Sequence, residues 1–203
     1  MKVKVTPSKV HGNVKIPASK SMAHRALICA SLSDGTSLVS NVTNSKDIEA
    51  TVGCMKALGA IIKQIDETTY EVTGTNLFKQ EGSITCNANE SGSTLRFLIP
   101  LAACTNAKVK FLGQGRLLQR PMDVYANEFK KQNIEFNQSD KEIIVSGNLQ
   151  AKDYVVQGDI SSQFITGFMF VLPLLNQDST LTITKPYESK SYVNLTIQML
   201  AKF

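Results

Sequence analysis

The sequence predicts an α/β fold of three βαβαββ repeats, in which the first helices are buried and parallel and the third repeat is incomplete. The first observation is that similar apolar segments recur about 70 residues apart, with Ser21, Gly92 and Ser162 at equivalent places. A fixed period of this length indicates repeated supersecondary units. The second observation is that each segment lies between two short runs with the pattern of strands, which is typical of α/β units.

Each repeat begins with a strand, a helix and a second strand. The first strands are predicted at residues 12–16, 82–86 and 153–157, and the helices that follow them at residues 19–30, 91–99 and 161–169. These helices are apolar on most faces, and a helix that is apolar all round is buried. The second strands are predicted at residues 36–39, 108–111 and 179–183.

A second helix and a hairpin complete the pattern. The second helices are expected from Asp47, Met122 and Tyr192, each shortly after Asn, Ser or Pro residues that favour helix starts. Hairpins are predicted where residues 60–64 meet 69–73 and where residues 134–137 meet 142–146. The third repeat has no hairpin before the sequence stops, so we expect one to follow in a longer protein.

Composition and charge exclude several classes of function. The chain has 203 residues, of which 42% are hydrophobic and 19% charged, as in an ordinary globular protein. The N-terminus lacks the apolar core of a secretory signal, and residues 164–175 are too few to span a bilayer, so we expect a cytoplasmic protein without a membrane partner. The net charge of +5 suits small anions, and the cations form no stripe for nucleic acid.

The cysteines and histidines do not predict a metal site. The chain has four cysteines, none in a Cys-x-x-Cys pair, and only two histidines. Three of the cysteines lie in apolar helical segments, where a reduced thiol behaves as a small hydrophobic group. We therefore expect no metal and a structural role for the reduced thiols of Cys29, Cys54, Cys86 and Cys104.

The starts of the three buried helices predict a site for anions. Helix N-termini carry unpaired N–H groups and a partial positive charge. Lys20 and Arg25 lie near the start of the first helix, where cations are disfavoured, and a bound anion would explain them. Gly92 would let a ligand approach the backbone. The alternative is that the serines at these starts are ordinary N-caps. The anion site requires Lys20, Gly92 and Gln163 to line one pocket.

The same residues resemble motifs of a known family. Residues 20–27, Lys-Ser-Met-Ala-His-Arg-Ala-Leu, resemble the K-S-x-x-x-R-A-L signature of EPSP synthases (3-phosphoshikimate 1-carboxyvinyltransferases). Residues 89–96 resemble the N-x-G-T-x-x-R loop of that family. Three further matches are Arg120-Pro-Met122, residues 158–164, and residues 189–192, which resemble S-K-P-Y. The motifs follow the family order along the whole chain and cover only the N-terminal half of the family's length.

The resemblance implies a fold and an activity. The fold would be an EPSP synthase-like domain, one half of an inside-out α/β barrel, with repeats at about 13–80, 81–150 and 151–203. Residues 1–12 would form a strand of the absent C-terminal domain. The family transfers the enolpyruvyl group of phosphoenolpyruvate to the 5-hydroxyl of shikimate 3-phosphate, a step of aromatic amino acid biosynthesis. No cofactor is implied, and a monomer is expected.

The resemblance also implies which residues meet the substrates. Phosphoenolpyruvate would be held by Lys20, Gly92, Arg120 and Gln163, and a guanidinium suits phosphate or carboxylate. Lys20 would be the catalytic residue of this half, because the family's proton-transfer carboxylates belong to the C-terminal domain. The fragment alone is therefore expected to be inactive. The shikimate 3-phosphate site would be formed by Lys20, Ser21, Arg25, Ser161, Ser162, Gln163 and Ser189.

Four other residues near these motifs receive weaker interpretations. Arg96 is expected to support the Gly92 loop, Asp47 to be a helix-start carboxylate, and His24 to be a structural histidine. Tyr192 suits packing and the substrate site equally. Two departures from the motifs, at residues 90 and 191, place Glu where many relatives have Asn and Ser where Pro is usual.

Two alternative functions remain open at this stage. UDP-N-acetylglucosamine enolpyruvyl transferase shares the fold and the phosphoenolpyruvate chemistry. That family has K-N where this chain has Lys20-Ser21, and usually a reactive cysteine in the loop that corresponds to residues 113–119, where this chain has none. The other alternative is a fragment that binds anions and performs no chemistry.

Overall fold

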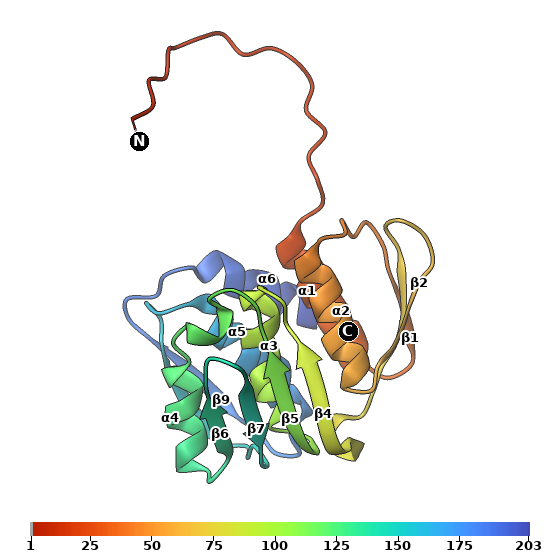
Figure 1. The fold of residues 1–203 in the computed structure, drawn as a ribbon, viewed down its shortest axis with the longest axis vertical. Helices are drawn as coiled ribbons and strands as arrows, with labels where there is room; N and C mark the ends of the chain where they lie inside the picture. Colours follow the sequence, from red (N-terminus) through yellow and green to blue (C-terminus); the bar gives the residue numbers. More distant parts are fainter. Residues whose placement is uncertain (1) are drawn as a thin grey trace.

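A computed structural model describes residues 2–203, which form three α/β units in sequence (Figure 1). The first unit contains the elements α1 (Lys20–Leu32), β1 (Thr36–Val39), α2 (Lys46–Ala57), β2 (Ile61–Gln64) and β3 (Tyr70–Thr73). The second contains β4 (Glu81–Asn87), α3 (Gly92–Ala102), β5 (Asn106–Leu112), α4 (Asp123–Lys131), β6 (Glu135–Gln138) and β7 (Ile143–Ser146). The third contains β8 (Asp153–Gln157), α5 (Ser162–Val171), β9 (Thr180–Thr184) and α6 (Lys190–Leu200).

Short 3₁₀ helices join some of these elements. They are η1 (Leu77–Lys79), η2 (Leu117–Gln119) and η3 (Leu172–Leu174). The element order confirms the predicted repeat, since the second unit is a complete βαβαββ unit and the third follows the same order as far as its second helix.

Strand pairing also repeats between the units. In the second unit β4 and β5 are parallel, with α3 as the crossover, and β7 pairs antiparallel with both β5 and β6. In the third unit β8 and β9 are parallel, with α5 as the crossover. In the first unit β3 pairs antiparallel with both β1 and β2. Because parallel strands lead into their helices from the same edge, the helices of this crossover type start at equivalent places.

The predicted strand at residues 12–16 is wrong. Residues 2–19 form no helix or strand, and in Figure 1 this segment runs away from the rest of the chain. The alternating apolar pattern is present, but Val14 and Ile16 are exposed. A strand needs a neighbour for its backbone hydrogen bonds, and within residues 2–203 β1 pairs only with β3. Residues 2–12 likewise form no strand within this chain, and Met1 lies outside the described residues.

The core consists of the apolar helices and the inner faces of the strands. Side chains such as Leu27, Leu98 and Phe168 are fully buried, which confirms the predicted burial of α1, α3 and α5. The helices α3 and α5 pack closely at Gly167, where a Cβ atom would lie 2.7 Å from the backbone oxygen of Arg96. Within residues 2–203, no helix combines the length and apolar character needed to cross a membrane. The free thiols of all four cysteines are buried, as predicted.

Candidate functional site

Serine side chains cap the N-termini of α1, α2, α3 and α5. Ser19 caps α1, Ser45 caps α2, and Ser91 and Ser161 cap α3 and α5, each by accepting a hydrogen bond from a backbone N–H of the first turn. The N-cap alternative is therefore correct for Ser91 and Ser161. It does not account for Ser21 or Ser162, which lie within the first turns of α1 and α5.

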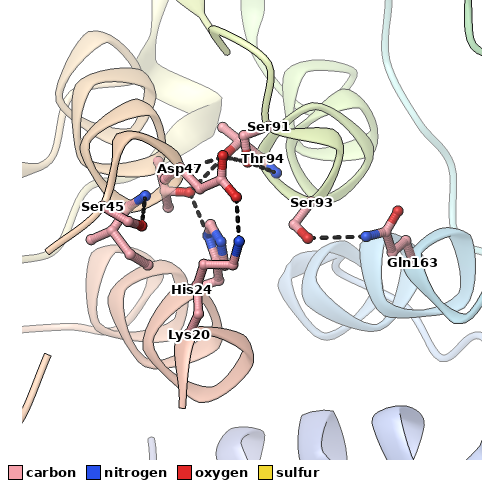
Figure 2. A network of polar contacts seen from close by, with 10 residues as sticks. Lys20, His24, Ser45, Asp47, Ser91, Ser93, Thr94 and Gln163 are labelled. Carbon is pink, nitrogen blue, oxygen red and sulfur yellow. Dashed lines mark hydrogen bonds and ion pairs between the residues drawn. The ribbon is translucent and has the colours of Figure 1, made fainter. Parts of the chain in front are cut away.

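The first turns of four helices, α1, α2, α3 and α5, lie near one another (Figure 2). Lys20 of α1 forms an ion pair of 2.5 Å with the carboxylate of Asp47 in α2. The hydroxyl of Thr94 in α3 lies 3.3 Å from the backbone oxygen of Asp47. Gln163 of α5 donates a hydrogen bond of 3.0 Å to the hydroxyl of Ser93 in α3. The structure thus brings the starts of α1, α3 and α5 together, with α2 between α1 and α3.

Gly92 lies where a guanidinium contacts the backbone. A Cβ atom added at this position would collide with Nη1 of Arg120 and would lie 4.0 Å from Oε1 of Gln163. Arg120 follows the 3₁₀ helix η2 and is exposed. The absence of a side chain at Gly92 therefore lets Arg120 approach the positive end of α3, beside Gln163. This arrangement brings three of the predicted residues into one place.

Arg96 adds a second guanidinium beside Gln163. Its Nη1 donates a hydrogen bond of 2.8 Å to Oε1 of Gln163, and its guanidinium carbon lies 4.9 Å from the ring centre of Phe164. Burial and the nearby charge of Arg120 lower the pKa of the Arg96 guanidinium. Arg96 thus contacts the site more directly than its predicted role in supporting the Gly92 loop.

Arg25 is buried one turn into α1, with 3% of its surface exposed. Its guanidinium donates hydrogen bonds to the backbone oxygen of Ser21 at 2.7 Å, to the hydroxyl of Thr196 at 2.8 Å and to the backbone oxygen of Tyr192 at 3.2 Å. Burial lowers its pKa to about 10. All these acceptors are neutral. Arg25 therefore connects α1 to α6, and its charge is not neutralised by any of these partners.

The arginines of this chain have no carboxylate partners. Within residues 2–203, every ion pair with a carboxylate involves a lysine. Buried or half-buried charges in proteins are usually paired, because an unpaired charge is costly to remove from water. The buried Arg25 and the half-buried Arg96 lie at or next to the converging helix starts, and the exposed Arg120 adds a third guanidinium there without a carboxylate in ion-pair contact. That arrangement favours the binding of an anion.

The remaining predicted residues occupy different environments. Ser21 is half-buried and Ser162 is buried, so their first-turn positions place them close to the converging helix starts. Ser189 precedes α6, is exposed and has a positive φ of 54°, and its side chain makes no capping hydrogen bond. Ser189 is thus at the start of a fifth helix, α6, which Arg25 connects to α1 through Tyr192 and Thr196.

A buried chain of hydroxyl groups lies behind the site and was not predicted. The Nδ1 atom of His24 lies 2.7 Å from the hydroxyl of Thr51, which lies 2.7 Å from the hydroxyl of Thr94. Thr94 in turn donates a hydrogen bond of 2.7 Å to Ser91. Burial lowers the pKa of His24 to about 4, so the ring is neutral at pH 7. The threonines of this network lie far apart in the sequence, and no sequence pattern predicts that they contact one another.

Asp47 has the predicted position in the first turn of α2, but its pairing with Lys20 was not predicted. A hollow of about 530 Å³ adjoins the site through Asp47. It is lined by Ser45, Lys46, Asp47, Glu49, Asn89, Glu90 and Gln114. Within residues 2–203, no group of three or more His, Cys, Asp or Glu side chains could hold a metal ion.

Comparison with known proteins assigns the family. The family model for EPSP synthase (3-phosphoshikimate 1-carboxyvinyltransferase) matches residues 5–203. The chain belongs to the EPSP synthase family. The 3-phosphoshikimate 1-carboxyvinyltransferase of Clostridium kluyveri is 48% identical over 203 residues, which cover 99% of this chain and 47% of that protein. The protein of the same name from Clostridium perfringens strain SM101 is 47% identical over 204 residues, which cover 100% of this chain and 48% of that protein.

Solved structures give the same fold. An EPSP synthase from Acinetobacter baumannii superposes with a TM-score of 0.78 at 20% sequence identity, over 95% of this chain and 43% of that chain. This likeness confirms the predicted EPSP synthase-like α/β domain. The chain spans about half the length of the curated relatives that it matches.

Proposed function

We propose that this chain supplies the N-terminal half of the active site of a 3-phosphoshikimate 1-carboxyvinyltransferase. The reaction transfers the enolpyruvyl group of phosphoenolpyruvate to the 5-hydroxyl of shikimate 3-phosphate and releases phosphate. The observation that carries this proposal is the set of guanidinium groups of Arg25, Arg96 and Arg120, which have no carboxylate partners at the converging helix starts. Both substrates are phosphate esters with a carboxylate, and such groups would balance these charges.

The phosphoenolpyruvate side of the proposed site is formed by Lys20, Gly92, Arg120 and Gln163. The close contact of Arg120 with Gly92 supports this assignment, because the guanidinium and the N–H groups at the start of α3 would donate to one anion. Lys20, which is half-exposed, retains two N–H donors beyond its bond to Asp47. It would stabilise the charge that develops on the substrate.

The shikimate 3-phosphate side is proposed to comprise Lys20, Ser21, Arg25, Ser161, Ser162, Gln163 and Ser189. The four serine hydroxyls and the Gln163 amide suit a polyol, and Lys20 and Arg25 suit its anionic groups. Arg25 is buried beneath Ser21, so it would act mainly at short range from behind the first turn of α1.

The proposed chemistry needs groups beyond those of this chain. The 5-hydroxyl gives its proton to a base as its oxygen forms a bond to C2 of phosphoenolpyruvate, and C3 gains a proton from an acid. The tetrahedral intermediate then loses a proton from C3 to a base and releases phosphate as the C2–O bond to phosphate breaks. The proton donor and acceptor are proposed to come from a C-terminal domain like that of the longer relatives. Residues 1–12 would add a strand to that domain, and closure of the two domains would exclude water. The complete enzyme is proposed to be cytoplasmic and monomeric.

The test joins residues 1–203 to the C-terminal half of the Clostridium kluyveri relative in a single chain. Phosphate release is measured with phosphoenolpyruvate and shikimate 3-phosphate, for the joined chain and for residues 1–203 alone. We expect turnover by the joined chain and none by residues 1–203. UDP-N-acetylglucosamine in place of shikimate 3-phosphate should give no phosphate. A folded joined chain that releases no phosphate with either acceptor would leave a non-catalytic anion-binding fragment as the function of this sequence.

A further inference from the structure

Arg96 has more hydrogen-bonding capacity than the chain uses. It lies in the second turn of α3, one turn beyond Gly92. A guanidinium carries five N–H donors, yet within residues 2–203 the Arg96 side chain makes one hydrogen bond, to Gln163. Its Nε atom is buried and has no partner among these residues. The guanidinium carbon lies 4.9 Å from the ring centre of Phe164, within the range of a cation–π contact.

The contact with Arg96 determines how the side-chain amide of Gln163 is oriented. Oε1 accepts from Arg96 at 2.8 Å and Nε2 donates to the hydroxyl of Ser93 at 3.0 Å. Arginine has no acceptor, so a reversed amide would place two donors against each other. Arg96 therefore holds the amide with its oxygen inward. The same oxygen is the Gln163 atom that lies nearest Gly92, 4.0 Å from the position of a Cβ atom there.

Arg96 and Arg120 also form a pair of like charges. Both lie against Gly92 or its neighbour Gln163, and neither has a carboxylate partner. The charge of Arg120 is close enough to contribute, after burial, to the lowered pKa of Arg96. Two adjacent guanidinium groups repel each other, and this repulsion is relieved better by an anion with two charges than by one with a single charge.

We propose that Arg96 is a positioning residue of the anion site, which fixes the Gln163 amide and, with Arg120, selects doubly charged anions over singly charged ones. This inference rests on the proposed function only for the identity of the anion, which there would be the phosphate of phosphoenolpyruvate. The orientation of Gln163 and the preference for two charges are properties of residues 1–203 and are tested on that chain.

The first experiment follows the side-chain amide of Gln163 by NMR in the 203-residue chain, without any anion. The variants are Arg96→Met, which keeps apolar cover on Phe164, Arg96→Lys, which keeps the charge and one donor, and Arg116→Met as the control. We expect the Gln163 amide resonances to move toward free glutamine in Arg96→Met, to move part of the way in Arg96→Lys, and to stay unchanged in Arg116→Met. If Arg96→Met does not fold, the Gln163 amide resonances of Arg96→Lys are compared with those of Arg116→Met, and this comparison tests the positioning role. An unchanged Gln163 amide in the folded Arg96 variants would refute the positioning role.

The second experiment titrates the same variants with inorganic phosphate at pH 8, where it is mainly doubly charged, and with acetate. We expect Arg96→Met to weaken phosphate binding about tenfold, as for the loss of one charge-assisted interaction, and acetate binding less than twofold. Equal losses for the two anions, or no phosphate binding by the unaltered chain, would refute the selection of doubly charged anions. If both experiments succeed and the joined chain is inactive, the proposed function fails and the inference about Arg96 stands.

Discussion

Two charged clusters of this protein differ in how their charges are balanced. At the Glu128 cluster, the carboxylate of α4 receives Lys152 at 2.5 Å, Lys131 at 3.0 Å and the amide of Gln132 at 3.1 Å. Burial alone would raise the pKa of Glu128, but these lysines bring it below its usual value. At the converging helix starts, Arg96 and Arg120 form no ion pair with any carboxylate of residues 2–203.

The difference separates charges that hold the fold from charges that are available to a ligand. The Glu128 cluster joins α4 to the residues just before β8, and its charges neutralise one another. The guanidinium groups at the helix starts instead repel one another, and the fold bears that cost. A protein that keeps unpaired cations beside helix N-termini is prepared to receive an anion. Substitutions in the two clusters should therefore affect different properties.

The largest expected effect is on turnover. Arg120→Ala in the joined chain should lower kcat/KM for phosphoenolpyruvate about a thousandfold, as for removal of a main donor to a developing charge. Because Arg120 is exposed, the free energy of unfolding should change by less than about 0.5 kcal/mol. Arg116→Ala, an exposed arginine outside the site, is the control for steady-state kinetics and urea unfolding. Comparable losses in the two variants would show that Arg120 is not part of the site.

The hydroxyl chain behind the site should make stability depend on pH. His24 has a pKa of about 4 in the fold and about 6.5 when unfolded, so the unfolded chain binds the proton first as the pH falls. The free energy of unfolding should therefore fall by about 3 kcal/mol as the pH is lowered from 6.5 to 4.

Between pH 6.5 and 5 few carboxylates titrate, so this window isolates the effect of His24. Urea unfolding at several pH values measures the slope, and His24→Gln should remove most of it. A slope that persists in His24→Gln would assign the dependence to other groups.

Glu128→Gln tests the other cluster. The substitution leaves Lys131 and Lys152 without a carboxylate, and we expect a loss of about 2 kcal/mol in the free energy of unfolding, because the side chain of Glu128 is only 10% exposed. Phosphate binding by the 203-residue chain should change less than twofold. Chemical unfolding and calorimetric titration measure the two properties. A loss of phosphate affinity with unchanged stability would contradict the division between the clusters.

The smallest effect is expected at the Lys20–Asp47 pair. The two side chains are 55% and 31% exposed, and ion pairs at such sites contribute about 0–1 kcal/mol. Asp47→Asn should therefore reduce the free energy of unfolding by no more than about 1 kcal/mol. Glu49→Gln, in the same first turn of α2, is the control. A loss of several kcal/mol in Asp47→Asn alone would place this pair among the charges that hold the fold.

Much of the fold was predictable because local sequence patterns determine most of its helices and strands. The period of about 70 residues and the apolar helices located nearly every element, including β1 and β8 at the residues predicted. The failure at residues 12–16 has a physical cause. The alternation of apolar residues indicates a strand, but a strand also needs a neighbouring strand, and no short segment of sequence states which one it will have.

The site was predictable only in part. Lys20, Gly92 and Gln163 were expected together because equivalent helices begin at equivalent places in repeats. The contacts that orient them were not, since Lys20 pairs with Asp47 across 27 residues and Arg96 with Gln163 across 67. Such contacts depend on how the helices pack against one another, and the apolar pattern of each helix does not specify that packing.

The close packing at Gly167 links the interior of the domain to the proposed anion site. Gly167 lies one turn after Gln163 on α5 and touches the backbone oxygen of Arg96 on α3. A methyl group there would separate the two helices and lengthen the Arg96–Gln163 hydrogen bond. A mutation in the core, away from any bound anion, should therefore change the anion preference proposed for Arg96 and Arg120, and a search for variants with altered preference should include this position.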